Sequence, residues 1–140
     1  MPDAQTDPYA WFNEAKFGMF LHWGIYSLLG RGEQVMFREH LVPSEYRRLA
    51  DEFTVPNFDA HEWARMARDA GMRYMVLTAK HHDGYCLFDS PGWDFCAPRT
   101  GPGRDLIAEY VEGCRAAGLR VGIYYSLQDW AFPVMFEGRE

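Results

Sequence analysis

The stretch that decides the fold reads AGMRYMVLTAKHHDG at residues 70–84. Its centre, 73–79, is a continuous apolar run typical of a strand buried on both faces. Gly71 supplies a natural helix end before it, and the polar residues from Lys80 to Asp83 follow it at once. A second stretch repeats this order: AGLR at 117–120 leads into a β-rich run, which Gln128, Asp129 and Trp130 follow. The repeat predicts parallel βα units.

The rest of the chain supplies further elements of the same kind. A short aromatic run at 17–21 predicts a buried first strand, which ends in His22-Trp23-Gly24. Helices are expected over 45–53 behind Ser44, over 60–70 behind Asp59 with Glu62, and over 105–117. In the second of these, Trp63, Met66 and Ala67 recur at helical spacing on one apolar face. Long connections are expected over 25–43 and 85–103, and a polar entry segment over 1–10.

Alternating strands and helices leave two architectures, an open doubly wound sheet and a (β/α)8 barrel. No G-x-G-x-x-G follows the first strand, and chemically capable side chains follow three separate strands, which favours the barrel. A full barrel takes about 250 residues. The 140 residues are therefore predicted to form only part of a barrel: three to four βα units, the N-terminal half of a TIM-like barrel. Its open sheet edges predict association with a second copy or with the remainder of the barrel.

Composition excludes several classes of function. The formal net charge is −6 and no basic run stands out, so neither nucleic acid nor an anionic membrane is an expected partner. Cys86, Cys96 and Cys114 form no C-x-x-C pair, which predicts buried thiols rather than a disulfide framework or zinc knuckle. No signal peptide or span of 18 apolar residues is seen, so a cytoplasmic location is the default expectation, with secretion left open.

The most informative polar group is His81-His82-Asp83. Adjacent histidines on a continuing strand point in opposite directions, which disfavours a shared metal unless the backbone turns, as Gly84 permits. The preferred interpretation is a polar pocket in which Asp83 fixes an imidazole tautomer. His22 is expected at the same end of the sheet.

Other candidates follow the strands. Glycoside hydrolysis needs two facing carboxyl groups, and the carboxylates near strand ends are Glu33, Asp83 and Asp129, without a pair of defined separation. Five aromatic side chains could stack on a sugar or pack in the core, and the sequence leaves both readings open: Trp23, Trp93, Trp130, Tyr85 and Tyr124.

Taken together, these segments resemble the α-L-fucosidases of glycoside hydrolase family 29. The resemblance spans residues 11–130 and is carried by KFGMFLHWGIYS at 16–27, FDA at 58–60 with Trp63, YMVLTAKHHDG at 74–84, RDL at 104–106, and GIYYS at 122–126 with Asp129-Trp130. It implies a (β/α)8-like catalytic domain that hydrolyses terminal α-L-fucosides with retention, without metal or other cofactor. The implied partner is a fucosylated glycan or small fucoside.

The resemblance also implies site residues. His22, His81 and His82 correspond to histidines that hydrogen-bond fucose hydroxyls, and a further pocket tyrosine is either Tyr124 or Tyr125. Glu33 matches the first residue of a family Glu-Trp pair, whereas Gln34 replaces the Trp. Trp23, Gln34, Asp83 and Trp130 are expected to support the pocket. The family's nucleophile and acid/base have no counterpart here, so no catalytic residue is assigned and the chain alone is expected to be inactive.

Two alternatives to a fucosidase remain at this point. One is a non-catalytic sugar-binding or assembly module that reuses the half-barrel. The weaker one is a metal-dependent hydrolase using His22, His81 and Asp83.

Overall fold

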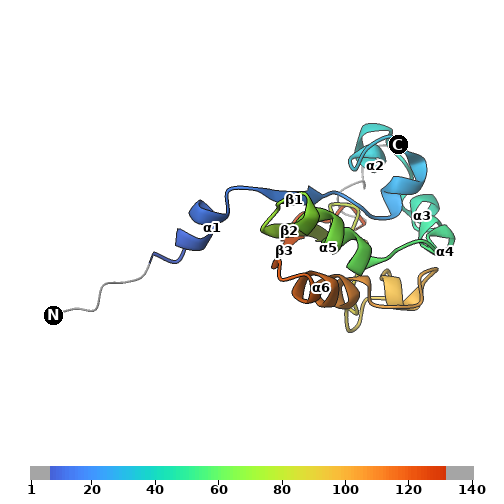
Figure 1. The fold of residues 1–140 in the computed structure, drawn as a ribbon. Coiled ribbons are helices and arrows are strands. Elements are labelled where there is room, and N and C mark those ends of the chain that lie inside the picture. Colours follow the sequence, from blue (N-terminus) through green and yellow to red (C-terminus); the bar gives the residue numbers. More distant parts are fainter. Residues whose placement is uncertain (1–6, 132–140) are drawn as a thin grey trace.

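A computed structural model describes residues 7–131 as one small parallel sheet with helices (Figure 1). The order of elements is α1 (Ala10–Ala15), β1 (Gly18–Leu21), η1 (Ile25–Leu29), α2 (Val35–Arg38), α3 (Pro43–Tyr46), α4 (Leu49–Glu52), α5 (Ala60–Asp69), β2 (Tyr74–Lys80), η2 (Ala97–Arg99), α6 (Leu106–Ala116) and β3 (Arg120–Tyr125). Strands and helices alternate as predicted.

The three strands pair in the order β1-β2-β3, and both pairings are parallel. Leu21 of β1 lies opposite Leu77 of β2, which in turn lies opposite Ile123 of β3. Parallel pairing brings the carboxyl ends of all three strands to one edge of the sheet. The polar groups that follow each strand are therefore brought to the same edge.

Helices α5 and α6 begin and end where local signals predicted. The side chains of Asp59 and Asp105 accept hydrogen bonds from the backbone N–H groups of Glu62 and Ala108, at 2.9 and 2.8 Å. These are N-cap contacts that satisfy otherwise unpaired helix donors. Gly71 and Gly118 follow the two helices with φ of +86° and +73°, the left-handed conformation of a helix stop.

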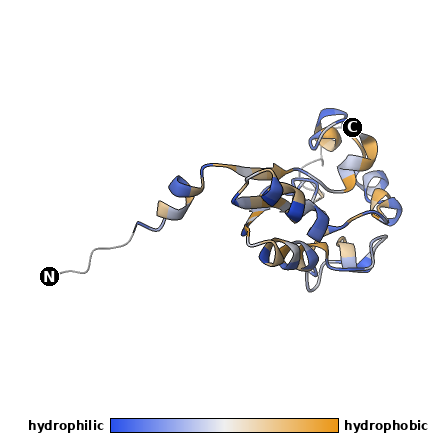
Figure 2. Ribbon diagram, in the orientation of Figure 1, coloured by the Kyte–Doolittle hydropathy of each residue, from blue (hydrophilic) through white to orange (hydrophobic). Residues whose placement is uncertain are grey.

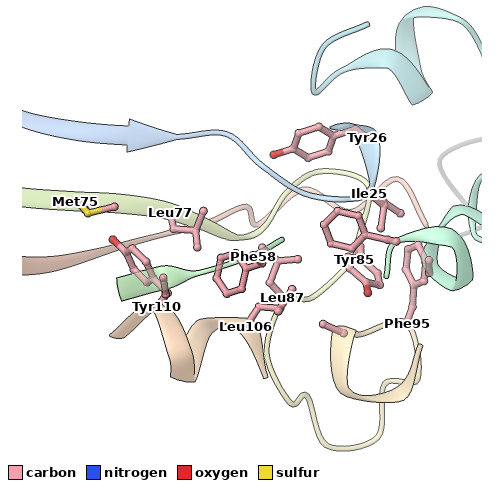
Figure 3. Close-up of a cluster of buried hydrophobic side chains, with 14 of the residues drawn as sticks. Ile25, Tyr26, Phe58, Met75, Leu77, Tyr85, Leu87, Phe95, Leu106 and Tyr110 are labelled. Carbon is pink, nitrogen blue, oxygen red and sulfur yellow. The ribbon is translucent and has the colours of Figure 1, made fainter. Parts of the chain in front are cut away.

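The hydrophobic core begins between the sheet and these two helices and continues beyond the strand ends, where Ile25, Tyr85 and Phe95 join it (Figure 3). Met75 and Leu77 of β2 are fully buried, as are Leu106 and Tyr110 of α6. Figure 2 shows the corresponding alternation of apolar and polar residues along the helices. The two helices approach so closely at Gly113 that a Cβ placed there would lie 2.7 Å from backbone atoms of Ala60.

The predicted first strand is not buried on both faces. Met19 and Leu21 pack against the core, but Phe20 is 52% exposed on the opposite face. Only one face of the sheet is covered by α5 and α6, and alternate side chains of an edge strand point away from it. In β3, Ile123 and Tyr125 are likewise exposed. Both outer strands therefore present apolar side chains to solvent.

Three further predictions about helices are wrong. The single helix over 45–53 is two short helices, α3 and α4, because the intervening turn uses tighter bonds, such as the one from the Ala50 N–H to the Arg47 carbonyl. Ser44 lies inside α3 rather than capping it. Met66 is 61% exposed, whereas alanines form the buried face of α5. Helix α1 extends past the predicted entry segment and lies at the start of the sheet (Figure 1), where the rings of Trp11 and Phe12 pack against Tyr74 of β2.

The two long connections are ordered. Residues 25–43 contain η1 and α2, and residues 85–103 carry η2 and bury Tyr85, Leu87 and Phe95. The three cysteines are free and buried, as expected. Within residues 7–131, no helix is long and apolar enough to cross a membrane.

Candidate active site

Three aromatic rings that follow or end separate strands meet beyond the sheet. The ring centroid of His22, after β1, lies 5.4 Å from that of His81, after β2. Tyr124, near the end of β3, lies 5.8 Å from both imidazoles. Phe20 stacks on His22 at 4.7 Å and completes an apolar side of the group. We call His22, His81, His82 and Tyr124 the strand-end cluster.

His82 belongs to the same cluster because the chain turns immediately after β2. Its ring centroid lies 4.3 Å from that of His81, so the two side chains do not point apart as a continuing strand would require. The backbone bond from the Gly84 N–H to the His81 carbonyl closes a tight turn, and Gly84 itself has a φ of +83°. The two histidines are therefore not opposed, because the backbone makes the turn that Gly84 was expected to permit.

Trp130 extends the cluster on the His82 side. Its ring lies 4.9 Å from His82 and stacks on Phe37 of α2 at 5.4 Å and 28°. The backbone N–H of Trp130 donates to the His82 carbonyl at 2.6 Å, which ties the segment after β3 to the turn after β2. Trp130, which was expected to support the pocket, therefore lies beside His82.

The structure separates the two candidate tyrosines. Tyr124 faces the imidazoles, whereas Tyr125 lies over the Lys80 ammonium at 5.3 Å and beside Phe88. Successive residues of a strand point to opposite faces, so only one of the pair reaches the cluster.

The charge of Glu33 acts to raise the pKa of His81 and His82, in opposition to burial, which lowers the pKa of both rings. Gln34 is the N-cap residue of α2.

Trp23 and Asp83, which were predicted to support the pocket, instead make contacts within the fold. The ring of Trp23 stacks on Phe58 at 5.0 Å and packs against Trp63, away from the imidazoles. Its backbone contributes instead, because the Thr78 hydroxyl donates to the Trp23 carbonyl at 2.8 Å and accepts from its N–H at 3.1 Å. This clamp fixes the chain just after His22. Tyr26 joins it through its hydroxyl, 3.2 Å from Thr78 Oγ1.

Asp83 is fully buried and does not hold a histidine. Its Oδ2 accepts from the Tyr46 hydroxyl at 2.8 Å and its Oδ1 from the Tyr85 N–H at 3.2 Å. Burial raises the pKa of this carboxyl to about 6, although both hydrogen bonds act in the opposite direction. The expectation that Asp83 fixes an imidazole tautomer is wrong; it anchors α3 to the turn instead.

Two of the three candidate carboxylates are thus held in structural contacts. Asp129 Oδ2 lies 3.1 Å from Lys80 Nζ and its Oδ1 accepts from the Ala131 N–H at 3.0 Å. Asp83 is held by Tyr46, which leaves Glu33 as the candidate carboxylate whose charge acts on the pKa of His81 and His82. Over the described range, no three His, Cys, Asp or Glu side chains converge as metal ligands would. The arrangement provides neutral hydrogen-bonding groups beside aromatic surfaces.

Two residues that contact the cluster or its supporting segment were not among the predicted site residues: Lys80 and Ser126. Lys80 is buried, and its ammonium donates to the carbonyls of Ser126 and Gln128 at 3.2 and 3.1 Å in addition to its contact with Asp129. The Ser126 hydroxyl lies 2.5 Å from His82 Nδ1. A lysine at the end of an apolar strand was the available signal, because buried lysines are almost always paired.

The electrostatics of the cluster keep its central imidazole neutral. Burial lowers the pKa of His81 to about 4, and the neighbouring charges of His82 and His22 act in the same direction. Burial and the Lys80 ammonium also lower the pKa of His82. At neutral pH each of these two rings therefore carries one proton and offers one donor and one acceptor.

We expect an NMR titration of the ring C–H signals to place the His81 midpoint near pH 4. A folded-state pKa below that of the unfolded chain means that His81 stabilises the fold above about pH 6.5 and that this contribution is lost as the pH falls toward 4. The His81→Gln variant assigns the signal. A His81 midpoint near the ordinary histidine value of about 6.5 would contradict the expectation.

Comparisons with known proteins identify the family to which the chain is related. The family model described as alpha-L-fucosidase matches residues 2–140. The human tissue alpha-L-fucosidase is 36% identical over 142 residues, which cover 89% of this chain and 30% of the relative. The chain thus spans about a third of the length of the curated relatives it matches.

Two solved structures extend the similarity to the fold. The alpha-L-fucosidase isoenzyme 1 of Paenibacillus thiaminolyticus is 49% identical, with a TM-score of 0.87 over 89% of this chain and 30% of that one. The alpha-L-fucosidase AlfC of Lactobacillus casei, in complex with its α-L-fucose product, is 40% identical, with a TM-score of 0.82 over 91% of this chain and 44% of that one. The chain belongs to the α-L-fucosidase family, glycoside hydrolase family 29.

Proposed function

We propose that this chain forms the N-terminal half of a fucosidase barrel and supplies one side of its α-L-fucose pocket. The observation that carries this proposal is the convergence of His22, His81, His82 and Tyr124 beyond the carboxyl ends of three parallel strands. In parallel α/β barrels, that end of the sheet carries the active site. The L. casei relative binds α-L-fucose, which supports the same ligand class here.

The chemistry of the cluster fits a neutral deoxy sugar. Imidazole and phenol groups donate and accept hydrogen bonds without requiring a charged partner, and so match sugar hydroxyl groups. Phe20 and Trp130 provide apolar surface beside them, suited to the methyl group and apolar ring face of fucose. The proposed substrate class is a terminal α-L-fucoside of a glycan or small molecule.

Hydrolysis with retention needs a second set of groups. It requires a nucleophilic carboxylate and a separate acid/base about 5 Å away. Asp83 and Asp129 are held by Tyr46 and Lys80, so neither is proposed as the nucleophile. We propose that this chain binds fucose and does not cleave fucosides by itself.

The experiment is a titration of the chain with L-fucose, followed by NMR of the imidazole signals. The mirror-image sugar D-fucose is the control ligand, because it has the same composition and a different arrangement of hydroxyl groups. His22→Ala and His81→Ala are expected to weaken binding about tenfold, the effect of losing about 1.4 kcal/mol of hydrogen bonding. The exposed His61→Ala is the matched control and is expected to leave affinity unchanged.

Several outcomes would contradict the proposal. Equal affinity for D-fucose, or equal loss in the His61 variant, would remove the strand-end cluster as the fucose site. Release of phenol from an aryl α-L-fucoside at ordinary enzyme rates would contradict the absence of catalysis. Fucose binding by a stable oligomer without turnover would instead favour the non-catalytic sugar-binding module.

A further inference from the structure

Lys80 joins two segments that are distant in sequence. It is the last residue of β2, and its ammonium has three N–H donors. Three acceptors surround it: the Ser126 and Gln128 carbonyls at 3.2 and 3.1 Å, and Asp129 Oδ2 at 3.1 Å. All three belong to the segment after β3, so Lys80 holds that segment against the end of β2 and every donor is used.

Backbone bonds fix the same segment at both of its ends. The Ser126 N–H donates to the Lys80 carbonyl at 3.0 Å, and the Trp130 N–H donates to the His82 carbonyl at 2.6 Å. Ser126 is buried. Its side chain is therefore placed by contacts that do not involve its own hydroxyl.

The Ser126 hydroxyl has one proton and two neighbours. Its Oγ lies 3.1 Å from the Gln128 carbonyl oxygen, which can only accept a hydrogen bond. It also lies 2.5 Å from His82 Nδ1. When the Ser126 hydroxyl donates its proton to the Gln128 carbonyl, its oxygen can only accept a hydrogen bond from the imidazole of His82. Nδ1 of His82 must then carry the ring proton.

We propose that Ser126, positioned by Lys80, holds His82 in the tautomer protonated on Nδ1, so that Nε2 is an acceptor for a sugar hydroxyl. The tautomer assignment is independent of any ligand, whereas its use in binding rests on the proposed function. No other hydrogen bond of the His82 ring involves residues 7–131, so the contact with Ser126 is what selects between the two nitrogens. Ser126 and Lys80 are positioning residues, and the direction of the sugar contact follows from them.

His81 provides an internal comparison. Its Nδ1 is buried and finds no hydrogen-bond partner among the residues that the structure describes. Among residues 7–131, nothing comparable to Ser126 contacts Nδ1 of His81. Substitution of Ser126 should therefore change which ring nitrogen of His82 carries the proton, and should leave the tautomer of His81 unchanged.

The experiment is a long-range ¹H–¹⁵N correlation spectrum of the chain labelled with ¹⁵N-histidine, recorded at neutral pH. The two ring nitrogens have distinct shifts when protonated and unprotonated, so the spectrum reports the tautomer of each histidine. We expect His82 to be protonated on Nδ1 in the unmodified chain. In Ser126→Ala the proton should shift toward Nε2, the form preferred by a free imidazole, while His81 is unchanged.

Ser126→Thr tests the role of the hydroxyl itself and is expected to retain the Nδ1 tautomer. Ser44→Ala, which removes an exposed hydroxyl from α3, is the matched control and should change neither histidine. Titration with L-fucose should then show about fivefold weaker binding for Ser126→Ala, the consequence of a misdirected hydrogen bond.

The outcomes separate this inference from the proposed function. Protonation of His82 on Nε2 in the unmodified chain would overturn it, without any variant needing to fold. Retention of the Nδ1 tautomer in Ser126→Ala would overturn the role of the hydroxyl. The expected tautomer change in a chain that does not bind fucose would support the positioning role and reject the proposed sugar site.

Discussion

The Gly113→Val variant is expected to lose about 3 kcal/mol of its free energy of unfolding, the upper part of the range for overpacking a close contact. A Cβ at this position would lie 2.7 Å from the carbonyl carbon and oxygen of Ala60 and 3.0 Å from the His61 nitrogen. These are backbone atoms at the start of α5, and they cannot rotate away as a side chain can. Helix α6 would have to move away from α5 and expose part of the core.

The matched control for this prediction is Glu112→Val. It introduces the same β-branched residue one position earlier, on the exposed face of α6, and should cost about 0.5 kcal/mol of helix propensity. Urea unfolding of both variants, followed by circular dichroism, measures the difference. Equal losses in the two variants would show that the close approach of the helices is not what Gly113 provides.

Lys80→Met is expected to lower the free energy of unfolding by about 3 kcal/mol, as for other buried pairs that lose one partner. The side chains of Lys80 and Asp129 are only 6% and 17% exposed, so Asp129 would lose its counter-ion with limited access to water. The Ser126 and Gln128 carbonyls would lose a donor as well. Methionine has a similar apolar length, so the variant removes the charge and the donors with little change in volume.

Two variants test the origin of this loss. Arg68→Met breaks the exposed Arg68–Asp69 pair and should change stability by no more than about 0.5 kcal/mol. In a double-mutant cycle, Lys80→Met combined with Asp129→Asn should cost less than the sum of the two single changes. An additive cycle, or a Lys80→Met loss as small as that of Arg68→Met, would contradict a stabilising buried pair.

Helix ends and strand positions were predictable because their causes are local. Asp59 and Asp105 cap helices through backbone donors three residues away, and Gly71 and Gly118 stop them through their own φ angles. None of these contacts depends on the rest of the fold. The repeated helix-glycine-strand order then predicted parallel pairing, which the structure confirms.

Burial was predicted less well, because it depends on which face of an element is covered. Phe20 and Met66 are apolar and were expected to be buried, yet each points away from the layer formed by the sheet, α5 and α6. The choice between Tyr124 and Tyr125 was open for the same reason. Strand register and helix packing place Tyr124 beside the imidazoles and Tyr125 over Lys80.

By itself, the sequence determined the three strands, the two helices α5 and α6, the family and the identity of the histidines proposed to bind fucose. Those features depend on residue type and short-range spacing. Only the tertiary structure decided which groups meet: the turn at Gly84 brings His81 and His82 together, Asp83 goes to Tyr46, and Ser126 reaches His82. Each contact joins segments 37 to 44 residues apart or depends on one turn, so it forms only when parallel pairing has aligned the strand ends.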